Sequence, residues 1–81
     1  MIAITITRGN DQWVTSYDVW AKIGAYPMQE GDGAFVGNYP ISRNETFLTI
    51  EYDRPEYENW LFSALPIYNR TPGAFNQLSG A

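Results

Sequence analysis

Two segments of the chain alternate apolar and polar residues, which is the pattern of a β-strand with one buried face. Residues 2–7, IAITIT, place three isoleucines on one face and alanine or threonine on the other. In residues 45–52, ETFLTIEY, the alternation puts Leu48, Ile50 and Tyr52 on a common face. We expect both segments to be strands with one side turned toward the core.

The segment after the first strand supports two interpretations. Gly and Asn provide turn chemistry, and the sequence QWVTSYDVW that follows is rich in β-branched and aromatic residues. A β-hairpin over about residues 2–20 is therefore the favoured prediction. The alternative is a short helix capped by Ser16 and closed by Gly24. Both interpretations predict that Trp20 and Ile23 are buried.

Residues 24–44 contain four glycines and two prolines, which interrupt every hydrophobic periodicity. We expect a long loop with at most one short strand, at residues 34–36. Such a loop is uncommon in a compact domain unless it binds a partner or packs as an organised unit. Its aromatic and methionine side chains make it too apolar for a plain linker.

The segment after residue 52 has the marks of a helix. Asp53 can cap the helix, Pro55 is tolerated in its first turn, and Glu56 completes an Asp variant of the capping box. The apolar residues that follow have the i, i+3, i+4, i+7 spacing of one helical face: Tyr57, Trp60, Leu61 and Ala64. Pro66 ends the predicted helix within about three turns.

These elements predict an α+β fold, in which a small antiparallel sheet of about three to four strands packs against one short amphipathic helix. The chain has 81 residues and no internal repeat, so we expect a single domain over residues 1–81. A domain of this size has a barely sufficient hydrophobic core, so its aromatic residues must supply much of the buried area. The end of the chain, residues 76–81, is expected to be loose.

The charge of the chain bears on its partners. Nine acidic and five basic residues give a formal net charge of −4, and the basic residues are scattered along the sequence. Proteins that bind DNA or RNA directly normally cluster Lys and Arg against the phosphates, so we expect no direct nucleic-acid contact. A basic protein surface is the expected partner.

The chain has no cysteine, which excludes disulfides and thiolate metal sites and favours an intracellular, cytoplasmic protein. No segment resembles a secretory leader, and no run approaches the roughly 20 apolar residues that span a bilayer. We therefore expect no membrane association.

The richest candidate site is EYDRPEYENW, residues 51–60, which holds four carboxylates, two tyrosines and a tryptophan around a single arginine. The cap and the dipole of the predicted helix account for Asp53 and Glu56, but Glu51 and Glu58 lie outside the cap. Exposed Tyr and Trp dominate protein interfaces. The predicted partner-binding residues are Glu51, Asp53, Glu56, Tyr57, Glu58, Trp13 and Tyr39.

Catalytic and ligand signatures are absent from the sequence. There is no His or Cys to act as general base or thiol nucleophile. Glu51 and Asp53 are same-face strand neighbours about 7 Å apart, a spacing that many inert strands share. The GDG at residues 31–33 lacks the other oxygen ligands of a calcium loop and the Lys-Ser/Thr of a phosphate loop. We therefore predict no enzymatic activity, no cofactor and no metal.

These expectations combine into a small, acidic, non-enzymatic protein-binding domain. In size and composition the chain is similar to the acidic, cysteine-free proteins with which bacteriophages and mobile elements block host defence. That similarity implies an anti-CRISPR or anti-restriction type of inhibitor, bound to a nucleoprotein complex in the host cytoplasm. The alternative is a structural subunit of a virion or a homo-oligomer, in which the aromatic residues are buried against other copies.

Overall fold

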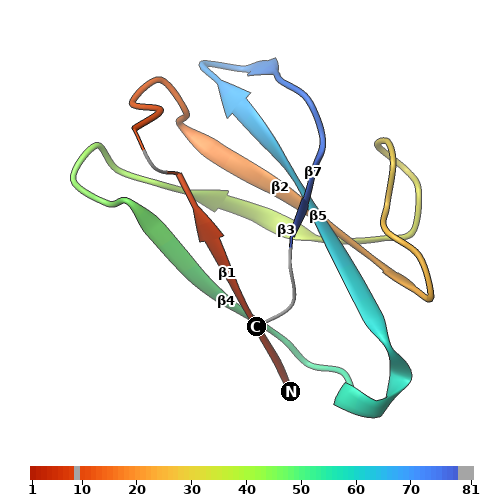
Figure 1. Ribbon diagram of the computed structural model, residues 1–81. Coiled ribbons are helices and arrows are strands. Elements are labelled where there is room, and N and C mark those ends of the chain that lie inside the picture. The colour runs from red at the N-terminus through yellow and green to blue at the C-terminus, as the bar shows by residue number, and fades with distance from the viewer. Residues whose placement is uncertain (9, 79–81) are drawn as a thin grey trace.

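The computed structural model describes residues 1–8 and 10–78, which form an antiparallel β-structure (Figure 1). Its elements are β1 (Ile2–Thr7), β2 (Ser16–Ile23), β3 (Ala34–Pro40), β4 (Phe47–Tyr52), the 3-10 helix η1 (Glu56–Glu58), β5 (Trp60–Tyr68), β6 (Thr71–Pro72) and β7 (Asn76–Leu78). Because η1 has only three residues, the described part of the chain contains no helix long and apolar enough to cross a membrane.

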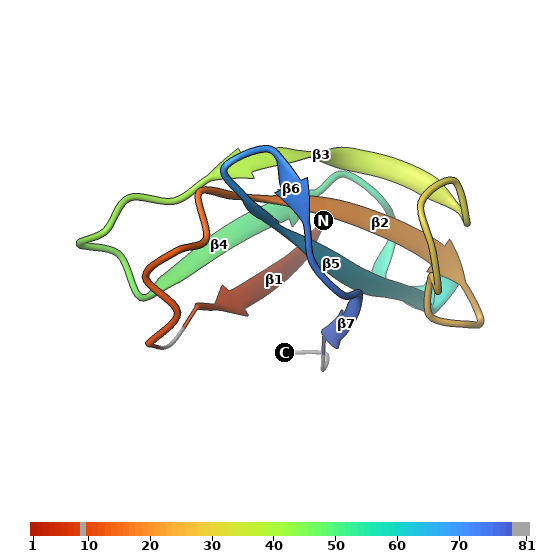
Figure 2. The same ribbon diagram turned by 90° about the horizontal axis from the view of Figure 1, so that it is seen from above.

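The strands lie in two facing layers of unequal width (Figure 2). One layer is a ribbon of two strands, β1 and β4. The other is a sheet in the order β3-β2-β5, in which β6 and β7 pair with different parts of the far edge of β5. β1 lies beside β7, so β4 is the strand of the ribbon on the side of β3.

The core fills the space between the two layers. In β1 the alternation buries Ile4 and Ile6, and in β4 it buries Ile50. The strands predicted at 2–7 and 45–52 are thus confirmed, the second beginning at Phe47. The buried residues of the core are Ile4, Ile6, Val14, Tyr17, Val19, Ala21, Ile41, Ile50, Phe62 and Ala64.

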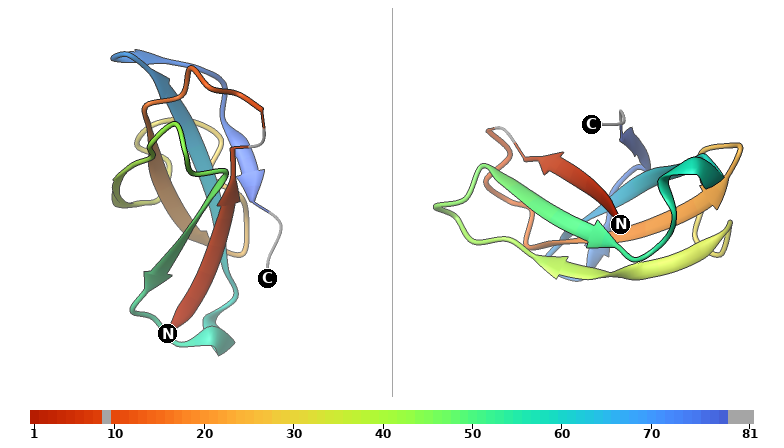
Figure 3. Two further views of the ribbon diagram at one scale, coloured as in Figure 1. Left: turned by 90° about the vertical axis from the view of Figure 1, so that its left-hand side faces the viewer. Right: turned by 90° about the horizontal axis from the view of Figure 1, so that it is seen from below.

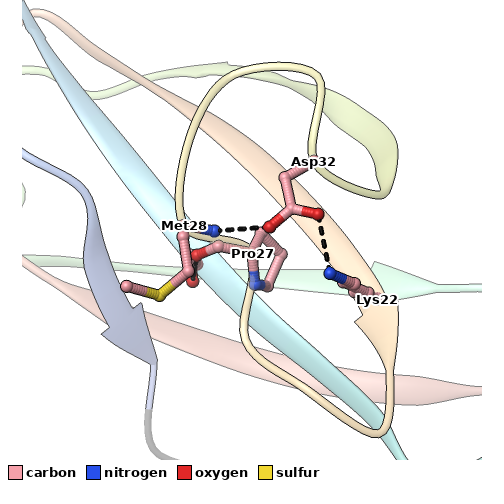
Figure 4. A network of polar contacts seen from close by, with 5 residues as sticks. Lys22, Pro27, Met28 and Asp32 are labelled. Carbon is pink, nitrogen blue, oxygen red and sulfur yellow. Dashed lines mark hydrogen bonds and ion pairs between the residues drawn. The ribbon is translucent and has the colours of Figure 1, made fainter.

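The loop between β2 and β3 folds back over the outer face of the larger sheet (Figure 4). Ser63 Oγ donates a hydrogen bond of 2.8 Å to the Pro27 carbonyl, and both residues are almost fully buried. The Asp32 carboxylate accepts hydrogen bonds from Lys22 Nζ at 2.7 Å and from the Met28 amide at 3.0 Å. These two donors hold the pKa of Asp32 below its ordinary value. The loop is therefore an organised cover for the sheet.

Arg8 joins two loops at one end of the molecule. Its side chain is buried and donates three hydrogen bonds to backbone carbonyls: Nε to Glu45 at 2.8 Å, and the terminal nitrogens to Asp11 at 3.2 Å and to Arg43 at 3.0 Å. The loop after β1 is thereby tied to the loop after β3. The guanidinium of Arg8 therefore serves the fold, and it is not part of the exposed surface.

The predicted α+β fold is wrong, because the segment expected to be a helix forms η1 and most of β5. Pro55 has extended backbone, with φ −65° and ψ 137°, and Asn59 is left-handed, with φ 57° and ψ 50°. Helical geometry is confined to the three residues between them. No side chain among residues 1–8 and 10–78 caps η1, so the predicted capping box at Asp53 does not form.

The apolar positions that suggested a helical face belong to a central strand buried on both sides. Phe62 and Ala64 face the core, whereas Ser63 and Leu65 are buried on the outer face, Ser63 against Pro27 of the loop between β2 and β3. A continuous apolar run of this kind is typical of a doubly buried strand and cannot be distinguished from a helix by periodicity. Pro66 does not end the element, and its carbonyl accepts a hydrogen bond of 2.8 Å from the Gly73 amide.

The predicted hairpin over residues 2–20 is also wrong. β1 pairs with β4, from Ile2↔Tyr52 to Thr7↔Phe47, and β2 pairs with β3 and β5. The chain crosses between layers after β1, so the apolar sides of β1 and β2 meet face to face across the core. The alternative helix from Ser16 is absent, since that segment is β2.

Two other segments differ from the loops expected from the sequence. The short strand predicted at 34–36 extends to Pro40 as β3, with a β-bulge that places Val19 opposite Gly37 and Trp20 opposite Phe35. In the segment 76–81, Asn76–Leu78 form β7 and pair with β5. Residues 79–81 lie outside the described residues.

Candidate functional site

The end of β4 and the turn into β5 present five of the predicted partner-binding residues, which we call the acidic end: Glu51, Asp53, Glu56, Tyr57 and Glu58. The turn is held by backbone hydrogen bonds, from the Arg54 amide to the Tyr52 carbonyl at 2.8 Å and from the Glu58 amide to the Pro55 carbonyl at 3.3 Å. The Gly24 amide donates to the Asn59 carbonyl at 3.1 Å and ties the turn to the end of β2.

A group of aromatic rings supports the turn from inside. The ring of Tyr52 meets Trp60 edge-on, with centroids 5.3 Å apart, and meets Phe62 at 5.6 Å. The guanidinium carbon of Arg54 lies 4.9 Å from the Tyr52 centroid and 6.0 Å from that of Trp60. Trp60 Nε1 donates to Glu58 Oε1 at 3.1 Å. The only cation and one carboxylate of residues 51–60 are therefore engaged with aromatic rings of this group.

The remaining carboxylates of the acidic end are free to bind a partner. Glu51, Asp53 and Glu56 are exposed, and their side chains form no hydrogen bond or ion pair with any other described residue. Tyr57 is 88% exposed on η1. Four carboxylates against one guanidinium leave residues 51–60 with a formal charge of −3. The acidic end is thus an acidic surface with a projecting aromatic ring.

Trp13 and Tyr39 do not join this surface. Trp13 is 73% exposed, as is typical of an interface residue, but it lies in the loop between β1 and β2, at the end of the molecule opposite η1 (Figure 1). Tyr39 is half-buried on the inner face of β3, opposite Tyr17, and its ring lies against Gly37. The seven predicted residues are therefore distributed over three places.

Two exposed apolar residues near the acidic end were missed. Ile23, which was predicted to be buried, is 54% exposed where β2 pairs with Trp60, and Met1 is 62% exposed before Ile2, which pairs with Tyr52. Their position follows from strand pairing between segments distant in sequence. The sequence carries no local signal that could have found them.

A cavity of about 320 Å³ lies between β1 and the β5–β7 side of the sheet, lined in part by Arg8, Asp11, Tyr17 and Tyr68. Tyr68 donates to Asp11 Oδ2 at 2.6 Å, and this bond raises the pKa of Tyr68. Burial, with a smaller contribution from Asp11, raises the pKa of Tyr17 against the opposing effect of Arg8. Both phenols are therefore held in the protonated form and are poor nucleophiles.

Comparison of the chain with protein-family models, with curated proteins and with solved structures gave no match. Within the described part of the chain no three carboxylates lie close enough to hold a metal ion. The function is therefore argued from the surface alone.

Proposed function

We propose that the chain is a small non-enzymatic binding domain whose acidic end docks on a basic surface of a larger protein. The proposal is supported by one observation above all: residues 51–57 carry three exposed carboxylates without partners among the described residues, together with an 88% exposed tyrosine on a braced turn. Such a turn loses little conformational entropy on binding. Its negative charge accelerates encounter with Arg and Lys.

The partner we propose is a nucleoprotein complex, whose protein surfaces are basic where they meet nucleic acid. The chain would occupy such a surface stoichiometrically and act as an inhibitor of the anti-CRISPR or anti-restriction type in the host cytoplasm. This finer proposal rests on the size of the chain, its formal net charge of −4 and the position of the free carboxylates.

Charge-reversal variants test whether the acidic end, and not another part of the surface, binds the partner. Glu51→Lys and Glu56→Lys change free carboxylates, whereas the same change at Glu58 would also remove the acceptor of the Trp60 indole. Glu30→Lys is the matched control, because Glu30 is an exposed carboxylate in the loop between β2 and β3. The tagged variants are used to capture partners from bacterial lysate that contains defence complexes, at low and high salt.

The proposal predicts a nucleoprotein complex that the wild-type chain and Glu30→Lys retain at low salt and release at high salt. Glu51→Lys and Glu56→Lys should each retain less of it. Equal retention by all four proteins would refute the placement of the binding surface.

The alternative proposal is an assembly subunit. It is favoured by the exposed apolar residues at both ends of the molecule, Trp13 at one and Met1, Ile23 and Tyr57 at the other. The mass of the chain in solution between micromolar and millimolar concentration distinguishes the two proposals. Growth into oligomers supports assembly, and a constant monomer mass supports the binding domain.

A further inference from the structure

One edge of β4 has no partner strand in the part of the chain that the structure describes. β4 pairs with β1 on one side, and on its other side no strand among residues 1–8 and 10–78 pairs with it. β4 forms the lower left border of the molecule in Figure 1 and a border in the side view of Figure 3, whereas the view from below shows β3 of the larger sheet on the side of β4 away from β1. An unpaired strand edge presents a row of free donors and acceptors to another chain.

The register shows which backbone groups point outward. The Arg8 amide donates to the Thr46 carbonyl at 2.8 Å, one step beyond the pair Thr7↔Phe47. In an antiparallel ladder every second residue pair exchanges hydrogen bonds, so Leu48 and Ile50 bond to β1. The amides and carbonyls of the residues between them point away from β1: Phe47, Thr49 and Glu51.

The larger sheet extends beyond this open edge. The ribbon is only two strands wide, so the inner face of β3 is covered incompletely. Tyr39 and Val36 of β3 pack against the core but remain half-buried. A strand added to β4 would continue the ribbon over β3, and its inward side chains would cover these two residues.

Another open edge, that of β3, is less suited to strand addition. β3 carries a bulge between its pairings with Val19 and Trp20, has Gly37 in its middle and ends in Pro40. Bulges and prolines are devices that protect sheet edges from added strands. β4 has neither, since its register with β1 runs without interruption over six residues.

Charge identifies the occupant. A second copy of the chain, paired antiparallel about Thr49, would place Glu45 opposite Asp53 at two positions, and like charges directly opposite are destabilising. An extended segment rich in Lys or Arg would instead meet Glu45, Glu51 and Asp53 with opposite charge. We propose that the open edge of β4 binds a basic segment of the partner as an added antiparallel strand. This inference rests on the proposed function and specifies how the partner is held.

The probe is a nine-residue peptide, KTKVTVFTK, designed to pair with residues 45–53 and to place lysines opposite the three carboxylates. The control peptide, ETEVTVFTE, keeps the pattern and reverses the charge. Amide hydrogen exchange by NMR reports binding. The lysine peptide should slow exchange of the outward amides of Phe47, Thr49 and Glu51 and leave those of Ala3 and Thr5, on the outer edge of β1, unchanged. Absence of slowing at millimolar peptide, or equal slowing by the glutamate peptide, would overturn the inference.

Two substitutions separate strand addition from general charge attraction. Thr49→Pro removes an outward amide that does not bond to β1, so it should leave the β1–β4 ladder intact. It should weaken the affinity for the lysine peptide at least about tenfold relative to Thr49→Ala. Tyr39→Ala should weaken it as well, whereas Trp13→Ala, at the opposite end, should not.

These variants also distinguish failure of this inference from failure of the proposed function. Circular dichroism first establishes whether Thr49→Pro is folded. If folded Thr49→Pro binds the lysine peptide as well as Thr49→Ala does, while Glu51→Lys abolishes binding, strand addition is refuted and the proposed acidic binding surface stands. If Glu51→Lys has no effect either, both are refuted. Should Thr49→Pro not fold, the exchange experiment on the wild-type chain decides alone.

Discussion

The loop between β2 and β3 contains two glycines with similar φ but different surroundings, which makes a sharp test of its packing. Gly31 and Gly33 both have positive φ, +86° and +97°. A Cβ atom on Gly31 would have no heavy atom within 4 Å. A Cβ atom on Gly33 would lie 2.4 Å from the Ala21 carbonyl oxygen, inside the sheet that the loop covers. Replacing each glycine by alanine therefore separates backbone strain from collision.

The magnitudes follow from these two contributions. Left-handed backbone costs an alanine about 1–2 kcal/mol, and the lower entropy of its unfolded chain returns about 0.4–1 kcal/mol. Gly31→Ala should therefore lose about 1 kcal/mol of unfolding free energy. In Gly33→Ala the methyl group also displaces the backbone of β2 or of the loop, and overpacking of this kind adds about 1–3 kcal/mol. We expect a total loss of about 2–4 kcal/mol.

Urea unfolding monitored by tryptophan fluorescence measures both losses. The slope of the free energy against urea should be the same for the wild-type chain and both variants, so that a lower midpoint reports stability alone. If Gly33→Ala is within about 0.5 kcal/mol of Gly31→Ala, the end of the loop does not press on β2 at Ala21.

Three further predictions test the polar contacts of the fold. Arg8→Met removes three hydrogen bonds to carbonyls and should cost about 3 kcal/mol by the same urea experiment; a loss below about 1 kcal/mol would contradict the role of Arg8 in joining the loops. The lowered pKa of Asp32 contributes stability above its ordinary value of 3.8, and this is lost as the pH falls through the lowered pKa. The melting temperatures of the wild-type chain and Asp32→Asn should therefore converge as the pH falls below 3.8 and through the lowered pKa, and a constant difference from pH 2 to 7 would refute the ion pair with Lys22. The raised pKa of Tyr68 contributes stability below pH 10.0 that is lost as the pH rises through the raised value. Tyr68→Phe should thus lose less stability than the wild-type chain in melting experiments above pH 10, and an equal loss would show that the bond to Asp11 does not hold the phenol proton.

The strands that could be predicted from the sequence are those with one buried face and one face exposed to solvent. β1 and β4 satisfy this condition, because their outer faces meet solvent, and their alternation revealed both strands. β5 does not satisfy it. Residues 62–66 are all buried, with Phe62 and Ala64 in the core on one side and Ser63 against the loop between β2 and β3 on the other, so the apolar run carries no period of two.

The pairing of the strands could not be predicted from neighbouring residues, for a different reason. A turn sequence between two β-rich segments favours a hairpin, because short connections usually join adjacent antiparallel strands. Here the loop after β1 carries the chain into the other layer, where Arg8 fixes it to the loop after β3. The carbonyls that accept from the Arg8 side chain belong to residues 3 to 37 positions away along the chain.

The candidate site shows the same division between local and distant information. Glu51, Asp53, Glu56, Tyr57 and Glu58 are close in sequence, so any compact turn would bring them together, whether helical or not. Tyr39 was selected as an exposed anchor, but its role depends on the width of the opposing ribbon. Since that ribbon stops at β4, the inner face of β3 is left half-covered. The backbone amides and carbonyls of Phe47, Thr49 and Glu51, which point away from β1, then form an open strand edge. The sequence contains the alternation, but only the arrangement of layers leaves one edge of β4 without a paired strand among the described residues.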